Sequence, residues 1–272
     1  MERQYSIGHP EDGGPKVLAP QELTYSSYLK VPSLLQLQEL LSEPPDHDEM
    51  LFIIIHQTYE LWFKQIIHEL EAALKAMQEG RILETHHFVR RIVRIMHVLV
   101  QQIHVLETMA TVEFLQFRDR LNPASGFQSV QFREIEFMGG LKSERYLSVF
   151  EHHTDSQAAL KARLEGPDLW QAFSRLLGIE SGAEKQAALD AVVALYQRPE
   201  ANLPLFLLAE SLMDFDEALI LWRSHHVMMV ERVIGMRPGT GGSAGVGYLE
   251  STRSKRCFPL LWEARTYLRK NA

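Results

Sequence analysis

Hydrophobic positions recur at helical spacing along most of the chain. Between Phe52 and Met77 apolar side chains return every three or four residues, which predicts one amphipathic helix ending at Gly80. Asp46 follows two prolines and has Glu49 three residues on, a reciprocal capping pattern that marks the start of this helix. The predicted helix has about nine turns.

Two more long helices follow from the same periodicity. One is predicted over residues 85–120, where the Asn122-Pro123 step ends it, because a residue before proline avoids helical backbone. The other is predicted over 204–235, with a proline in its first turn. Shorter helical segments are predicted over residues 130–138, 143–150, 156–164, 168–177, 183–196 and 258–268.

The pattern favours an all-α fold. No segment alternates apolar and polar residues with a period of two, and no repeat of fixed length occurs. Long helices joined by short turns predict a multi-helix bundle with three long core helices. We expect residues 1–22, rich in proline and glycine, to be a flexible segment, and residues 23–272 to form a single domain.

Composition narrows the class of protein. With 28 Lys and Arg against 35 Asp and Glu, the net charge of −7 disfavours nucleic acid as a partner. The single cysteine, Cys257, excludes an intrachain disulfide and a Cys-rich zinc site. The longest purely apolar run, Met50 to Ile55, is too short to cross a bilayer, and no signal core opens the chain. We expect a soluble cytoplasmic protein without a membrane partner.

Twelve histidines invite a search for metal and cofactor sites. The chain contains no HExxH, and only Glu84 to His87 matches one half of the bundle di-iron pattern. Covalent haem attachment needs two cysteines, so it is excluded. The known metal spacings therefore assign no site.

His226 lies in the middle of the third long helix with Trp222 one turn earlier on the same face. Its imidazole is expected to point into an aromatic-lined apolar space, whereas His225 points about 100° away. Two interpretations remain open on this evidence. His226 is either a core histidine hydrogen-bonded to a neighbouring helix or the axial ligand of a haem.

Three more residues have both a structural and a functional interpretation. His56 follows Phe52 by one turn and is either plain core or a hydrogen-bonding group opposite His226. Arg118 is either a solvated cation at a helix end or a clamp for a substrate carboxylate. The loop GTGGSAGVG follows a helix rather than a strand, so it is not a dinucleotide motif, but Thr240 offers a ligand its hydroxyl and amide.

Four blocks of sequence, in order, closely resemble the tryptophan 2,3-dioxygenase family: HDEMLFIIIHQTYELWFKQIIHEL, FLQFRDRLNPASGFQSVQFREIE, HHVMMVERVIG and GTGGSAGVGYLEST. The resemblance spans about Leu23 to Leu268. It implies an all-helical cytosolic homotetramer with one non-covalent haem b per subunit. It also implies cleavage of the indole C2–C3 bond of L-tryptophan with O2 to give N-formyl-L-kynurenine, the first step of tryptophan catabolism by the kynurenine pathway.

The resemblance also implies roles for individual residues. His226 matches the proximal iron ligand, and His56 matches the distal residue that hydrogen-bonds the indole nitrogen while Phe52 packs on the ring. Arg118 matches the residue that grips the substrate carboxylate. Thr240 matches the residue that contacts the ammonium group.

Further matches concern the edge of the cofactor and the neighbouring subunit. Ser125 and Gly126 match the small-residue turn beside the haem edge, and Trp222 is expected to line the same slot. Phe114 stands where some bacterial members have a tyrosine that helps to hold the carboxylate, and we expect activity to survive the difference. The segment that reaches into a neighbouring subunit's pocket matches Tyr25, Tyr28 and Leu29.

Two hypotheses from other classes compete with the dioxygenase. A haem pocket alone does not specify catalysis, so a haem-based gas sensor or carrier is the first alternative. A helical interaction scaffold without a cofactor is the second.

Overall fold

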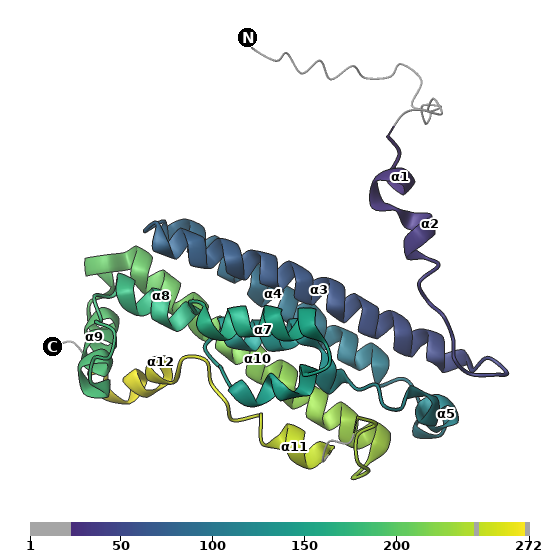
Figure 1. The fold of residues 1–272 in the computed structure, drawn as a ribbon. Helices are drawn as coiled ribbons and strands as arrows, with labels where there is room; N and C mark the ends of the chain where they lie inside the picture. Colours follow the sequence, from purple (N-terminus) through teal and green to yellow (C-terminus); the bar gives the residue numbers. More distant parts are fainter. Residues whose placement is uncertain (1–22, 242–244, 270–272) are drawn as a thin grey trace. The chain divides into compact units, whose positions relative to one another are not determined.

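The computed structural model describes residues 23–241 and 245–269, and within these ranges the chain forms helices, turns and loops but no strand (Figure 1). The all-α prediction is confirmed. No helix in the described ranges is both long and apolar enough to cross a membrane. The chain divides into two compact units, residues 1–39 and 40–272, which are described separately.

The described part of the first unit, residues 23–39, contains two short helices, α1 (Tyr25–Leu29) and α2 (Val31–Leu34). The Thr24 hydroxyl caps α1 by accepting a hydrogen bond from the Ser27 amide at 3.0 Å. None of these residues is buried within the chain. The segment 1–22, which the sequence predicts to be flexible, lies outside the described residues.

In the second unit the first long helix is α3 (His47–Gln78). One of the two hydrogen bonds predicted for its N-terminal cap is present. The Asp46 carboxylate accepts from the Asp48 amide at 3.0 Å, as a cap should. The prediction that Glu49 reaches back to Asp46 is wrong, because Glu49 instead accepts from the Ser42 amide at 2.9 Å. The Ser42 hydroxyl takes over the reciprocal role by accepting from the Asp46 amide at 2.7 Å.

The helix predicted over residues 85–120 is wrong as a single element. The chain forms three elements there, α4 (Ile82–Leu106), α5 (Thr111–Phe117) and the 3₁₀ turn η1 (Arg118–Leu121). Side chains compete with the backbone at the break, because the Thr108 hydroxyl donates to the Val105 carbonyl at 2.7 Å. The Glu113 carboxylate then accepts from the Ala110 amide at 2.8 Å and starts α5.

The third long helix, α10 (Leu203–Ile234), confirms the prediction over 204–235. Asn202 caps its start by accepting from the Leu205 amide at 3.3 Å, and Gly235 follows its end with φ +60°. Helices α3, α4 and α10 run alongside one another and enclose the main core (Figure 1). The Tyr59 hydroxyl ties α3 to α4 by donating to the Leu99 carbonyl at 3.1 Å.

Shorter elements surround these three helices. The predicted segment 143–150 forms two 3₁₀ turns, and the glycine-rich loop is shorter than predicted because a helix begins at Val246. The remaining short predictions are confirmed to within a few residues. The elements are η2 (Gly126–Gln128), α6 (Val130–Met138), η3 (Glu144–Tyr146), η4 (Ser148–Phe150), α7 (Thr154–Glu165), α8 (Leu169–Leu176), α9 (Lys185–Gln197), η5 (Pro199–Asn202), α11 (Val246–Glu250), α12 (Pro259–Ala264) and η6 (Arg265–Tyr267).

Candidate functional site

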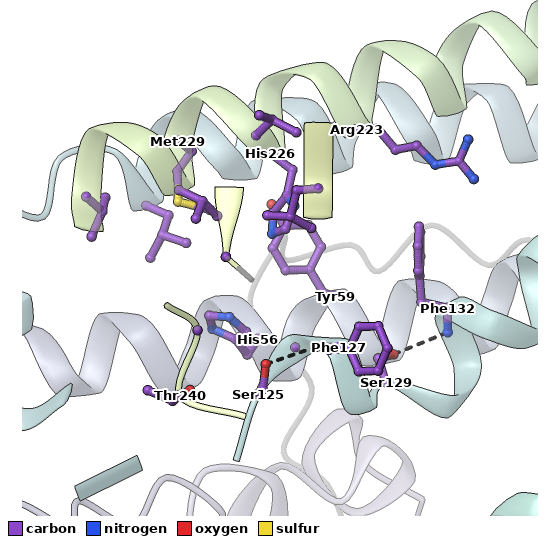
Figure 2. Close-up of a pocket in the computed structure, with 18 of the residues that line it drawn as sticks. His56, Tyr59, Ser125, Phe127, Ser129, Phe132, Arg223, His226, Met229 and Thr240 are labelled. Carbon is purple, nitrogen blue, oxygen red and sulfur yellow. Dashed lines mark hydrogen bonds between the residues drawn. The ribbon is translucent and has the colours of Figure 1, made fainter. Parts of the chain in front are cut away.

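A cavity of about 1490 Å³, counting the space open to solvent at its mouth, lies inside the second unit. Helices α3 and α10 form opposite walls, and the segments around residues 118–136 and 239–252 complete it (Figure 2). The structure brings to this cavity every predicted site residue of the second unit, namely Phe52, His56, Phe114, Arg118, Ser125, Gly126, Trp222, His226 and Thr240. Tyr25, Tyr28 and Leu29 belong to the first unit, so their place relative to the cavity is not defined.

His226 enters the cavity from α10. Its ring stacks on Trp222, with centroids 5.1 Å apart and planes 5° apart, and within the described residues its imidazole forms no hydrogen bond. Burial, assisted by His56 and Arg133, lowers the pKa of His226 to about 4. The ring is therefore neutral at pH 7 and keeps a nitrogen lone pair available to a metal or to a donor.

His56 faces the cavity from α3. Its Nδ1 lies 2.7 Å from the Phe52 carbonyl, and because a carbonyl can only accept, Nδ1 carries the proton. Burial lowers the pKa of His56, despite this hydrogen bond and the nearby Glu60 carboxylate, which both favour the charged ring. In the neutral ring Nε2 is then an acceptor. The Phe52 ring lies beside it, with centroids 4.1 Å apart.

Arg118 and Thr240 line the cavity where two segments meet, and this part of the cavity is called the rim below. Arg118 Nη2 donates to the Pro238 carbonyl at 2.6 Å, and its ion pair with Asp119 is long, at 4.0 Å. The Thr240 hydroxyl donates to the Ala124 carbonyl at 2.6 Å. Within the described residues this guanidinium has only a long ion pair, and the Thr240 hydroxyl and two carbonyls lie in the same region. Such a set suits a ligand that carries both a carboxylate and an ammonium group.

Phe114 and the 125–126 turn complete this side of the cavity. The Phe114 ring lies 5.6 Å from the Phe52 ring between centroids, so it contributes an apolar surface where a tyrosine would add a hydroxyl. Ser125 caps η2, with its hydroxyl accepting from the Phe127 amide at 3.4 Å. Gly126 has open space where a side chain would begin.

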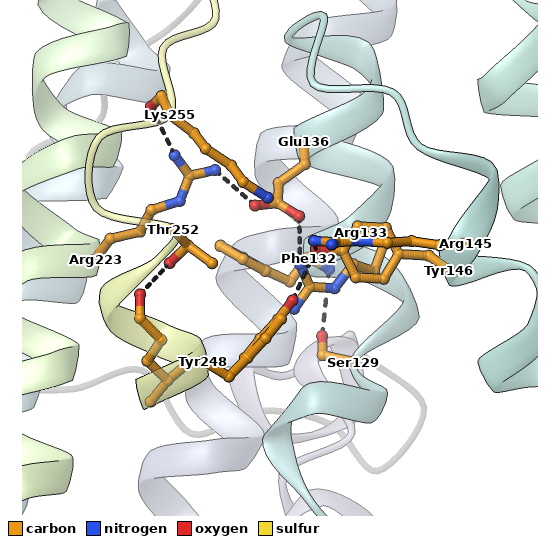
Figure 3. Close-up of polar contacts among 11 residues, drawn as sticks. Ser129, Phe132, Arg133, Glu136, Arg145, Tyr146, Arg223, Tyr248, Thr252 and Lys255 are labelled. Atoms are coloured by element: carbon orange, nitrogen blue, oxygen red, sulfur yellow. Dashed lines mark hydrogen bonds and ion pairs between the residues drawn. The ribbon is translucent and has the colours of Figure 1, made fainter. Parts of the chain in front are cut away.

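The far wall of the cavity carries positive charge at residues that the sequence analysis above did not single out. Arg133 from α6 and Arg223 from α10 share one carboxylate, that of Glu136, with Arg223 Nη2 at 2.6 Å (Figure 3). All three side chains are buried, and among the residues that the structure describes the Nε atoms of both arginines have no hydrogen-bond partner. Two guanidiniums against one carboxylate leave an excess of buried positive charge that an anionic group would balance.

Aromatic rings extend this wall. The Arg133 guanidinium lies 4.4 Å from the centroid of the Tyr146 ring, and the Tyr146 and Tyr248 hydroxyls are 2.7 Å apart. Burial opposes ionisation of Tyr146, but Arg133 and a hydrogen bond from Arg145 outweigh it and lower the pKa of Tyr146. Burial and the Tyr146 hydroxyl raise the pKa of Tyr248 to about 12. Tyr248 therefore remains a neutral hydroxyl at the edge of the cavity.

A sequence signal for this wall exists. Arg133 and Glu136 are three residues apart in QFREIEF, a short helical segment whose other residues are mostly apolar, and Arg223 interrupts the apolar run before His226. Charged residues on a buried helix face are rare unless they are paired or functional. The pattern identifies candidates, but it does not show which of them meet.

Comparison with known proteins identifies the family. The family model described as tryptophan 2,3-dioxygenase matches residues 11–187 and 179–268. The tryptophan 2,3-dioxygenase of Nocardioides sp. is 50% identical over 257 residues, covering 91% of this chain and 95% of that protein. The chain belongs to the tryptophan 2,3-dioxygenase family.

Other relatives agree. The tryptophan 2,3-dioxygenases of Caulobacter vibrioides and Herpetosiphon aurantiacus are 41% and 44% identical over 263 and 260 residues, and each match covers 91% of this chain and 99% of the relative. The family resemblance read from the sequence is therefore confirmed. The matched ranges of the tryptophan 2,3-dioxygenase model include every cavity residue named above.

Proposed function

We propose that this protein is a haem-dependent dioxygenase that cleaves the indole C2–C3 bond of L-tryptophan with O2. The product is N-formyl-L-kynurenine, which contains both oxygen atoms, and the reaction is the first step of the kynurenine pathway. One observation carries the proposal: two neutral imidazoles from opposite helices line one cavity that has a guanidinium at its rim. Membership of the tryptophan 2,3-dioxygenase family supports it.

The residues of the cavity fit one haem b per subunit. His226 offers a neutral imidazole nitrogen without a hydrogen bond in the described part of the chain, so it could hold a haem iron. Much of the lining is apolar, and Trp222 packs on the His226 ring. The unpartnered Nε groups of Arg133 and Arg223 suit the anionic propionate groups of the cofactor.

Each cavity residue then has a specific task. A bound haem supplies the ferrous iron that activates O2. His226 would hold the iron, and Ser125 and Gly126 would lie beside the cofactor. His56 Nε2 accepts a hydrogen bond from the indole N–H, since its own proton is engaged on Nδ1. Phe52 packs against the indole ring.

The rim fixes the amino-acid end of the substrate. Arg118 binds the carboxylate, adding a charge-assisted hydrogen bond to the one that its Nη2 donates to the Pro238 carbonyl. Such a contact contributes about 1.5–3 kcal/mol and discriminates against indole, which has no carboxylate. Thr240 contacts the ammonium group. Phe114 offers no hydroxyl, so Arg118 carries more of the carboxylate contact than where a tyrosine assists.

We further propose a cytoplasmic homotetramer in which the N-terminal segment completes a neighbouring subunit's pocket. Several large apolar side chains of the first unit are exposed within the chain, among them Tyr25 at 78%, Tyr28 at 70% and Leu29 at 44%. Apolar side chains in such a run are stabilised when another surface covers them. A second copy of the chain provides that surface.

Absorption spectra of the purified protein, ferric and then ferrous, with and without L-tryptophan, test the proposal. We expect a Soret band that shifts when L-tryptophan binds, and formation of formylkynurenine in air. A Soret band without turnover would favour the haem-based gas sensor or carrier. Absence of haem after reconstitution with hemin would favour a cofactor-free scaffold.

A further inference from the structure

Gly241 lies unusually close to Ser125. A Cβ atom built on Gly241 would lie 2.6 Å from Ser125 Cβ, 3.2 Å from Ser125 Oγ and 3.5 Å from the Pro123 carbonyl oxygen. Real Cβ atoms essentially never approach another heavy atom within 3.0 Å. Any side chain at position 241 would therefore move the two segments apart.

Two hydrogen bonds join the same segments. The Thr240 hydroxyl donates to the Ala124 carbonyl at 2.6 Å, and Arg118 donates to the Pro238 carbonyl at 2.6 Å. Figure 2 shows Thr240 and Ser125 at the same end of the cavity. Residues 238–241 thus lie against the chain that carries Arg118, and at Gly241 the opposing Ser125 leaves no room for a side chain.

Ser125 has little freedom to move aside. Its hydroxyl accepts from the Phe127 amide, and its own amide donates to the Gln128 side-chain oxygen at 3.2 Å, so both groups hold the start of η2. The atom closest to the added methyl group is Ser125 Cβ, which moves only with its backbone. The 238–241 segment is then the part that must shift.

We propose that Gly241 is a positioning residue for the amino-acid end of the substrate. It acts by leaving room for residues 238–241 to rest on the 123–125 turn, which places Thr240 beside Arg118. This inference rests on the proposed function, since it assigns the contacts of that substrate. A side chain at position 241 moves Thr240 outward and weakens substrate binding, while haem binding through His226 is unaffected.

Gly241→Ala tests this inference in the haem-loaded enzyme, with Gly247→Ala as the matched control. Gly247 lies in α11 of the same region, but a Cβ there meets no atom within 4 Å. We expect Gly241→Ala to raise the KM for L-tryptophan at least about tenfold, which corresponds to ~1.4 kcal/mol. Its haem content, melting temperature and kcat should stay close to wild type, and Gly247→Ala should match wild type throughout.

Removing the opposing side chain should restore the fit. The single variant Ser125→Gly is measured as the reference. The double variant Gly241→Ala/Ser125→Gly should have nearly the same KM for L-tryptophan as this reference. The inference is overturned if Gly241→Ala leaves KM within twofold of wild type, lowers haem content or melting temperature as much as it weakens binding, or is not rescued in the double variant.

Amide hydrogen exchange tests the role of Gly241 independently of the proposed function, because it measures the mobility of the segment and does not depend on turnover. Amides in the 237–241 peptide should exchange faster in Gly241→Ala and return to the Ser125→Gly rate in the double variant. Unchanged exchange overturns the inference. If the wild-type enzyme binds haem but does not turn over L-tryptophan, the proposed function is overturned. The amide exchange rates of Gly241→Ala still test whether Gly241 holds residues 238–241 in place.

Discussion

Two histidines in the cavity are uncharged near neutral pH, mainly because burial disfavours their charged forms. The two histidines differ in whether a ring nitrogen forms a hydrogen bond. His56 already donates through Nδ1 to Phe52, whereas His226 has no hydrogen bond within the described residues. His226 is thus suited to bind a metal, and His56 is suited to accept a hydrogen bond from the substrate.

Substitution His226→Ala should abolish stable haem binding, because it removes the proposed axial ligand. The haem content of the purified protein, from the pyridine haemochrome spectrum, measures this. His225→Ala is the matched control and should keep its haem, since the His225 ring packs 5.1 Å from His104 and does not line the cavity. Full activity and intact haem in His226→Ala would reassign the ligand.

The pH dependence of kcat should report the protonation state of His56. Because its pKa is lowered from 6.5, the ring stays neutral above that value, and kcat should be level from about pH 8 to 6.5. At lower pH a second proton converts Nε2 from acceptor to donor and kcat should fall. His56→Ala should keep its haem, lose about tenfold in kcat and lack this acidic limb. An identical limb in His56→Ala would contradict the assignment.

Arg118→Ala should raise the KM for L-tryptophan by about 10- to 150-fold, since a charge-assisted hydrogen bond to the carboxylate is lost. Haem content should not change. Arg120→Ala serves as the control, because Arg120 donates to the carbonyls of Leu41 and Glu43 and does not line the cavity. Steady-state kinetics on both variants separate the two arginines, and an unchanged KM for Arg118→Ala would remove its proposed role.

At the scale of elements, α10 connects the cavity to the rest of the fold. The same helix carries Trp222, Arg223 and His226 along the cavity and holds the C-terminal segment through Asp216. The buried Asp216 carboxylate accepts from the Cys257 and Phe258 amides at 2.9 and 3.1 Å and from the Trp262 indole at 3.0 Å. A carboxylate with three donors is a firm link between elements distant in sequence.

Asp216→Ala should destabilise the protein by about 3 kcal/mol or more, because three donors at a buried site lose their acceptor and each unsatisfied group costs about 1–3 kcal/mol. Urea unfolding measures the change in the free energy of unfolding. Asp190→Ala is the control, since Asp190 is exposed and, in the part of the chain that the structure describes, pairs only with Gln186 on the same helix. A loss below 1 kcal/mol for Asp216→Ala would show that the link is not structural.

At the level of the complete protein, the described part of the first unit, residues 23–39, has no buried core of its own. None of its described residues is buried, and its two helices contain five and four residues. Helices this short are not stable alone in water. In the proposed tetramer, a neighbouring subunit would cover the exposed tyrosines and leucines of these short helices.

Deletion of residues 1–39 should strongly lower turnover while haem content stays unchanged, because the cavity lies in the second unit. Mixing gives a sharper result. A truncated chain with an intact cavity, refolded together with full-length His226→Ala, should regain activity, since the inactive chain supplies the missing segment to its neighbour. Light scattering confirms the mixed oligomer. A fully active truncation, or a mixed oligomer without activity, would contradict the exchanged segment.

The helical class, the Asp46 cap, the start of α10 near its first-turn proline and the family could all be predicted from the sequence, because periodicity, capping residues and long motifs are local properties of the chain. Two other contacts could be seen only in the folded chain. Glu49 bonds Ser42 and not the Asp46 backbone, and Arg223 pairs with Glu136, 87 residues away in sequence. The same holds for the contact between Gly241 and Ser125. Such contacts depend on how the helices pack, and the spacing of the residues along the sequence does not predict them.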